Sequence, residues 1–183
     1  MALSSTIYNF DIDLADAGRQ VYETLALRVA RHPSESEPYL LTRVLAYALE
    51  YTDGIGFSRG LSEPDEPAIF VRDLTGALRV WVEIGTPDAE RLHRAAKAAP
   101  RVVVYTHKDP AQIVRRLAGE RIHHVEALEL YAIDRGFLGD LAARLDRRMA
   151  VSLSVTDGDL YLSIGSDTLT GHVTRHVVGR ERA

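Results

Sequence analysis

The sequence predicts one α/β (α+β) domain in which helices flank a mixed β-sheet. Segments with alternating apolar side chains, typical of half-buried strands, occur before, between and after segments with an apolar repeat typical of amphipathic helices. Some neighbouring strands are joined by short turns and others by a helix, which indicates both antiparallel and parallel pairing. No linker or repeat divides the chain, so residues 1–183 are expected to form a single domain with one sizeable core.

The first predicted elements are an antiparallel hairpin and a helix. Residues 5–15 alternate between apolar and polar side chains, and residues 20–30 do the same after an Asp-Ala-Gly turn. A helix is predicted within residues 32–51, because Ser34 and Glu37 have the spacing of a capping box and an apolar stripe follows. The stripe comprises Leu41, Val44, Leu45, Ala48 and Leu49.

Three strands and a second helix are predicted next. A short strand is expected at residues 54–60, and two longer strands flank a turn at residues 74–76. Residues 61–67, between the short strand and the first of the two longer strands, are an acidic loop with two prolines. A helix over residues 86–99 is predicted to have Thr86 at its N-cap and Pro87 at its first position, with acidic residues in the first turn.

The second half of the chain alternates between strands and helices before it ends in a hairpin. The last polar residues are expected to be irregular or to form a terminal edge strand. The predicted elements are a buried strand at 101–107, a helix at 109–119, a strand at 125–133, a helix at 134–148 capped by Asp134, and a hairpin at 149–165 that turns at Asp157 and Gly158.

The composition excludes several classes of protein. The chain has no cysteine, which excludes disulfides, thiolate zinc sites and thiol catalysis. No apolar run reaches the roughly 18 residues that a membrane span needs, and the first residues lack the pattern of a signal peptide. A cytoplasmic protein with no membrane partner is therefore expected.

Charge is distributed unevenly along the chain. The net charge is −4, but residues 91–124 carry eight basic and two acidic side chains. A basic middle segment on an acidic chain is consistent with a face that follows phosphates. The alternative is that these side chains cover solvated helices and are balanced by acids elsewhere in the fold.

Four stretches of the sequence resemble one known family. "RHPSESE", "EPDEPAIFVRDLTG", "WVEIGTPDAERLHRA" and "RVVVYTH" are similar to the YaeQ family, and the resemblance extends from "MALSSTIYNF" to the final hairpin. It implies a core like that of the PD-(D/E)XK nuclease superfamily: a helix, a three-stranded meander, a helix and a strand. Residues 37–107 are predicted to have this order, with the N-terminal hairpin and the C-terminal strands as additions.

The resemblance also implies a metal site that can be tested against the residues. Such nucleases hold Mg²⁺ or Mn²⁺ between two carboxylates on adjacent strands, and the ion generates the nucleophile. Pairing around the turn at 74–76 places Glu83 opposite Ala68, where the PD-(D/E)XK superfamily motif has aspartate. Asp65 or Glu66 would supply the second carboxylate if the loop folds back, with Glu83 and Asp65 as the metal ligands. Otherwise Asp65 is a solvated loop acid.

The lysine that follows the second carboxylate in such nucleases is also absent. Gly85 stands in its place. Lys97 on the next helix is a substitute, but its helical phase directs it away from the sheet, about 11 Å along the helix axis. Arg91 is preferred as the cation that positions phosphate or water; the alternative is an arginine that pairs with Asp88 or Glu90.

Other polar side chains are assigned by their position on predicted elements. Arg72, Tyr105 and His107 are further candidates for the wall of the same cleft. Glu50 is expected to face solvent, because its phase is opposite to the apolar stripe of its helix.

Three functions are compatible with these observations. The first is Mg²⁺-dependent hydrolysis of phosphodiesters in nucleic acid, with Glu83 as the central ligand. The second is a catalytically inactive protein with a decayed nuclease site that binds nucleic acid or the transcription machinery, which the YaeQ resemblance also implies. The third is a scaffold that binds only protein. The sequence leaves open DNA against RNA, the physiological partner and the oligomeric state.

Overall fold

Ten strands form one mixed sheet in a computed structural model that describes residues 4–59 and 65–179. Its order is β2-β1-β8-β9-β10-β7-β6-β5-β4-β3. β1 pairs parallel with β8, and β6 lies parallel to both β5 and β7. The strands are β1 (Thr6–Asp16), β2 (Val21–Arg31), β3 (Ile55–Phe57), β4 (Ile69–Arg72), β5 (Leu78–Ile84), β6 (Arg101–Thr106), β7 (Glu129–Ile133), β8 (Arg148–Thr156), β9 (Asp159–Ile164) and β10 (Asp167–Val177).

Four α-helices accompany the sheet, and none that the structure describes is both long and apolar enough to span a membrane. The predicted α+β class with a mixed sheet is thus confirmed. The helices are α1 (Glu37–Leu49), α2 (Ala89–Ala98), α3 (Pro110–Leu117) and α4 (Arg135–Ala142), with a 3-10 turn at Val125–Ala127.

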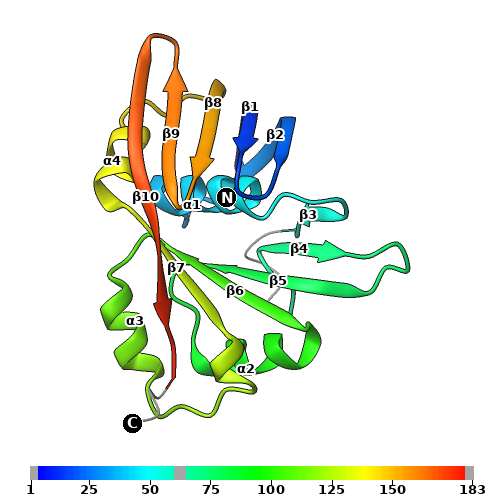
Figure 1. The fold of residues 1–183 in the computed structure, drawn as a ribbon. Coiled ribbons are helices and arrows are strands. Elements are labelled where there is room, and N and C mark those ends of the chain that lie inside the picture. The colour runs from blue at the N-terminus through cyan, green and yellow to red at the C-terminus, as the bar shows by residue number, and fades with distance from the viewer. Residues whose placement is uncertain (1–3, 60–64, 180–183) are drawn as a thin grey trace.

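Strand β10 joins two halves of the sheet. Its first part pairs with β9 and its second part with β7, so that β2, β1, β8 and β9 fan out on one side and β7 to β3 on the other (Figure 1). The expectation of an irregular tail or an edge strand is therefore wrong for this segment. The side chains of β10 are mostly exposed, which explains why its sequence does not read as an internal strand.

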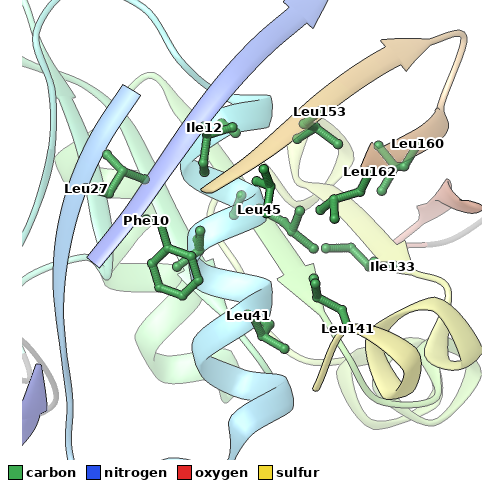
Figure 2. Packing of buried hydrophobic residues seen from close by; sticks show 14 of the residues in the cluster. Phe10, Ile12, Leu27, Leu41, Leu45, Ile133, Leu141, Leu153, Leu160 and Leu162 are labelled. Atoms are coloured by element: carbon green, nitrogen blue, oxygen red, sulfur yellow. The ribbon is translucent and has the colours of Figure 1, made fainter. Parts of the chain in front are cut away.

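Helix α1 lies where the two halves meet, and its side chains are buried on most sides (Figure 1). Leu41 and Leu45 contact a core that both halves contribute to. Figure 2 shows these two residues among side chains from β1, β2, β7, β8, β9 and α4. A second core fills the opposite face of β5 to β7 under α2 and α3, so these central strands are covered on both faces.

Two helices begin two residues later than predicted. Ser36, not Ser34, caps α1 by accepting from the Tyr39 backbone N–H at 3.2 Å. Ser34 instead pairs with the neighbouring His32 ring. Asp88, not Thr86, caps α2, because its carboxylate accepts from the Arg91 N–H at 2.8 Å. In each place two polar residues that favour helix ends lie two positions apart, and their residue types alone do not distinguish the cap.

The register of the β4–β5 hairpin follows the prediction. Ile69 pairs with Val82 and Phe70 with Trp81. Glu83, near the end of β5, therefore lies near Ala68, the residue before β4. The Ala68 N–H donates to the Val82 carbonyl at 3.1 Å, which holds the residue before β4 against β5.

Two glycines in the same region provide a matched test of backbone crowding. Gly54 and Gly76 both have a positive φ, of +86° and +83°. A Cβ on Gly54 would lie 1.9 Å from the Arg72 carbonyl oxygen, whereas one on Gly76 meets nothing within 4 Å. We expect Gly76→Ala to cost about 1 kcal/mol of unfolding free energy for the left-handed backbone alone. Gly54→Ala should cost about 2 kcal/mol, because the strand must also move. Equal midpoints in urea unfolding would contradict this.

Candidate functional site

A cavity of about 300 Å³ lies between the first half of α1, the start of β4 and the loop from β5 into α2. The end of β5, which includes Glu83, forms part of its wall. The lining residues are Tyr39, Arg43, Ser58, Glu66, Pro67, Ala68, Glu83, Ile84, Thr86, Pro87 and Arg91.

Glu83 is a buried carboxylate on the wall of this cavity, with only 5% of its surface exposed. Its Oε1 accepts from the Trp81 indole N–H at 2.5 Å and from the Arg91 Nε at 2.8 Å. Burial raises the pKa of Glu83, and the contacts with Arg91 and Trp81 act in the opposite direction. The face that carries Trp81 and Glu83 is covered by α2.

Arg91 in the first turn of α2 ties three segments together. Its Nε pairs with Glu83, one terminal nitrogen donates to the Glu66 carbonyl at 2.7 Å, and its guanidinium lies 5.8 Å from the centre of the Trp81 ring. The side chain thus pairs with Glu83 rather than with Asp88 or Glu90, the partners considered from the sequence. It links β5, α2 and the loop before β4.

The structure brings together only some of the predicted site residues. Glu66, Glu83 and Arg91 line the cavity. Asp65 is exposed, lies outside the lining and pairs with Arg94 at 3.5 Å. Lys97 is exposed in the last turn of α2 and is also outside the lining.

These donors do not fit the magnesium site of two convergent carboxylates that the resemblance implies. The residue before Ile69, which pairs with Val82 next to Glu83, is alanine, and Oε1 of Glu83 already accepts from two donors. Glu66 is exposed, and its carbonyl is held by Arg91. Within the described part of the chain, no group of three or more acids or histidines could hold a metal ion.

Gly85 has a structural reason to be glycine. Its φ is +88°, in the left-handed region that a lysine side chain rarely adopts. A Cβ there would lie 3.4 Å from the Tyr39 ring and 3.8 Å from His107. The backbone at this point therefore favours glycine over the expected lysine.

The comparison with protein families identifies the chain. A model of the family described as "YaeQ protein" matches residues 1–173. The chain belongs to the YaeQ family. It is 32% identical to YaeQ of Escherichia coli K12 over 176 residues, and 31% identical to YaeQ of Salmonella typhi over 175 residues; both alignments cover 95% of this chain and 97% of the relative.

Crystal structures of other YaeQ proteins have the same fold. YaeQ from Pseudomonas syringae superposes with a TM-score of 0.82 at 27% identity, covering 93% of this chain and 95% of that one. YaeQ from Xanthomonas axonopodis pv. citri gives 0.80 at 26% identity, covering 96% and 99%. This chain therefore shares its overall fold with these two YaeQ proteins.

The α1 side of the cavity in this YaeQ chain was not predicted. Arg43 is buried, pairs with Glu35 at 3.3 Å and donates to the Ala30 carbonyl at 2.7 Å. Tyr39, one turn earlier, is half-buried, and burial raises its pKa to about 12, with the charge of Glu35 adding to the effect. The four-residue spacing of Tyr39 and Arg43 places them on one helix face, but it does not indicate which cavity that face lines.

His107 lies beside this wall. Its ring is 6.0 Å from that of Tyr39, at 86°, and burial lowers its pKa to about 4, so the ring is neutral at pH 7. Arg72 is elsewhere, because it donates to the Gly76 carbonyl at the hairpin tip.

Glu50 and Tyr105 belong to a second, larger cavity of about 570 Å³ at the far end of α1. Glu50 is buried, so the expectation that it faces solvent is wrong. Its two oxygens accept from Arg101 at 2.5 and 3.2 Å, and the Tyr105 hydroxyl donates to it at 2.7 Å. Arg101 also pairs with Glu129 at 2.5 Å. Helical phase failed here because both halves of the sheet surround α1.

Part of the basic segment 91–124 is used inside the fold. Arg91 pairs with a carboxylate of β5, and Arg101 pairs with Glu50, directly after α1, and with Glu129 of β7. Arg116 of α3 donates to the carbonyls of Thr86 and Pro87, both at 3.0 Å, beside the cavity. The charge of the segment is therefore partly structural and partly placed around the candidate site.

Proposed function

We propose that this YaeQ chain binds nucleic acid at the mouth of the 300 Å³ cavity and does not hydrolyse it. In this proposal the segment from α1 through β3, β4, β5 and α2 to β6 is a PD-(D/E)XK-like core, with the order of a helix, a three-stranded meander, a helix and a strand. The hairpin β1–β2 and the strands β8 to β10 are additions to that core.

The observation that carries the proposal is the pairing of Glu83 with Arg91. A carboxylate that holds a catalytic ion must give its charge to the metal. Here the charge of Glu83 is balanced by a guanidinium 2.8 Å away, and Ala68 provides no second carboxylate. The acid therefore acts to orient Arg91, and Arg91 is the group that meets a ligand.

Arginines from two helices flank the mouth. Arg91 of α2 reaches the loop before β4, and Arg116 of α3 reaches the loop after β5. Guanidinium groups bind phosphate oxygens through several N–H donors at once, which supports a ligand with a phosphate backbone.

Binding can be tested by fluorescence anisotropy with labelled single- and double-stranded DNA and RNA at several salt concentrations. Arg116→Gln should weaken binding roughly 3- to 10-fold at low salt and reduce the slope of log K against log salt by about 1. Arg79→Gln is the matched control, because Arg79 lies at the opposite end of β5 and pairs with Asp73. Equal losses in both variants would contradict the assigned surface.

Hydrolysis that depends on Mg²⁺ or Mn²⁺ is the result that would overturn the proposal. The test is incubation of the same four nucleic acids with each ion, alongside calorimetric titration of the ion alone. Cleavage by the parent chain and not by Glu83→Gln would establish Glu83 as a ligand. Failure to bind any of the four at low salt would point to a protein ligand instead, such as the transcription machinery.

A further inference from the structure

The outer edge of β2 is a long strand edge that no other strand of the sheet covers. β2 is the terminal strand of the sheet and pairs with β1 along all of its 11 residues without a break in register. Residues 21–31 contain no proline, lysine or glycine, three of the devices that interrupt or protect a strand edge. An edge of this kind is a template for another strand.

The hydrogen bonds of β1 determine which β2 groups point outward. The Asn9 N–H donates to the Arg147 carbonyl, on the β8 side. The odd-numbered residues of β1 therefore direct their backbone N–H and C=O groups to β8, and the even-numbered residues direct theirs to β2. Their partners in β2, such as Leu25 opposite Ile12, are odd-numbered. The even-numbered residues of β2 therefore direct their backbone N–H and C=O groups to the outer edge.

One end of this edge is already used. Arg43 donates to the Ala30 carbonyl at 2.7 Å. The stretch that remains runs from Tyr22 to Arg28, and its midpoint is Leu25. An antiparallel strand centred on Leu25 would form hydrogen bonds with all four outward-facing residues of this stretch. The hydrogen bond between Arg43 and the Ala30 carbonyl would stay in place.

The same stretch is complementary to itself. In a symmetric pair centred on Leu25, Tyr22 of one chain lies opposite Arg28 of the other, and Thr24 lies opposite Ala26. Tyr22 is 65% exposed, one of few large apolar side chains exposed to this extent in the described residues. Opposite a guanidinium it gains a cation–π contact, twice in the pair. Two like charges do not meet at any of these positions.

We propose that a second copy of this chain binds along β2, antiparallel and centred on Leu25, so that the two sheets continue into one. The interface is isologous, with the same residues on both sides of a two-fold axis. This inference is independent of the nucleic-acid proposal, because β2 and the cavity mouth involve different residues.

The oligomeric state and its dependence on β2 can be measured by sedimentation equilibrium over a range of concentrations. We expect twice the monomer mass for the parent chain and for Ala26→Val, and the monomer mass for Ala26→Pro. Proline removes the outward N–H of residue 26 and leaves the bonds to β1 in place. A parent chain that stays monomeric, or a proline variant that stays dimeric and folded, would overturn the proposal.

Cross-linking tests the register without relying on proline. The chain has no cysteine, so introduced thiols are the only ones. With Leu25 at the centre, the double variant Thr24→Cys/Ala26→Cys should form disulfide-linked dimers under mild oxidation, because the two positions face each other about 5.5 Å apart. Each single variant should stay uncross-linked, since its own copies are offset beyond disulfide reach. Cross-linking of a single variant and not of the double one would overturn the register.

Discussion

Replacing Arg91 with methionine is expected to lower the free energy of unfolding by about 3 kcal/mol at pH 7, since it leaves the buried Glu83 without its cation. The loss should shrink as the pH falls. Burial already raises the pKa of Glu83 above its ordinary 4.5, so this group favours the folded state most below pH 4.5 and loses that contribution as the pH rises through the folded pKa. Without Arg91 the pKa rises further, and protonation relieves the unpaired charge.

Urea unfolding followed by circular dichroism at pH 7 and pH 5 measures both effects. Fluorescence is less suitable because the single tryptophan contacts the substituted site. The double variant Arg91→Met/Glu83→Gln is the control, and it should recover most of the loss because the charge is gone. If the double variant is no more stable than Arg91→Met, the loss comes from packing of the arginine stem.

Replacing Arg101 with methionine is the second large effect, also about 3 kcal/mol at pH 7. It removes the cation from Glu50 and from Glu129, and the partial exposure of Arg101 keeps the cost below that of a fully buried pair. The pH dependence differs from that of Arg91. Burial acts to raise the pKa of Glu129, but Arg101 holds it below 4.5, so its contribution is present above pH 4.5 and is lost below it.

The difference in unfolding free energy between the parent chain and Arg101→Met should therefore become smaller below pH 4.5. Arg79→Met is the matched control, because Arg79 also forms a short ion pair, with Asp73 at 2.6 Å, but is 59% exposed. We expect it to cost less than about 1 kcal/mol. Similar losses for the two arginines, measured by urea unfolding, would show that the Glu50–Arg101–Glu129 cluster adds nothing beyond a surface pair.

The sequence predicted local structure well where one face of an element is buried and the other is wet. The alternation in β1 and β2 and the β4–β5 register are of this kind, because a slip of one residue would exchange the two faces. It failed for β10, whose side chains are mostly exposed although its backbone is internal to the sheet. The polarity of side chains indicates which face of a strand is buried, but it does not indicate whether the backbone edges of the strand are hydrogen-bonded to neighbouring strands.

For the candidate site, the sequence identified residues but not their pairing. Glu83, Glu66 and Arg91 were all selected, and they line one cavity. The ion pair between Arg91 and Glu83 depends on the side-chain conformation of Arg91 in the first turn of α2. The spacing of residues in the sequence does not determine that conformation. Tyr39 and Arg43 were missed because the path of α1 past β5 is a long-range contact, set by two sheet halves that meet only in the folded chain.

The parallel pairing of β1 with β8 has a consequence for synthesis. Asn9 lies beside Arg148, a partner that follows 139 residues later in the chain. At bacterial elongation rates of about 5 to 20 residues per second, the N-terminal hairpin leaves the ribosome roughly 7 to 28 seconds before the strand that completes it. During that interval the edge of β1 that later pairs with β8 is open to other chains. The β8-facing edge of β1 is thus without its partner strand for most of translation.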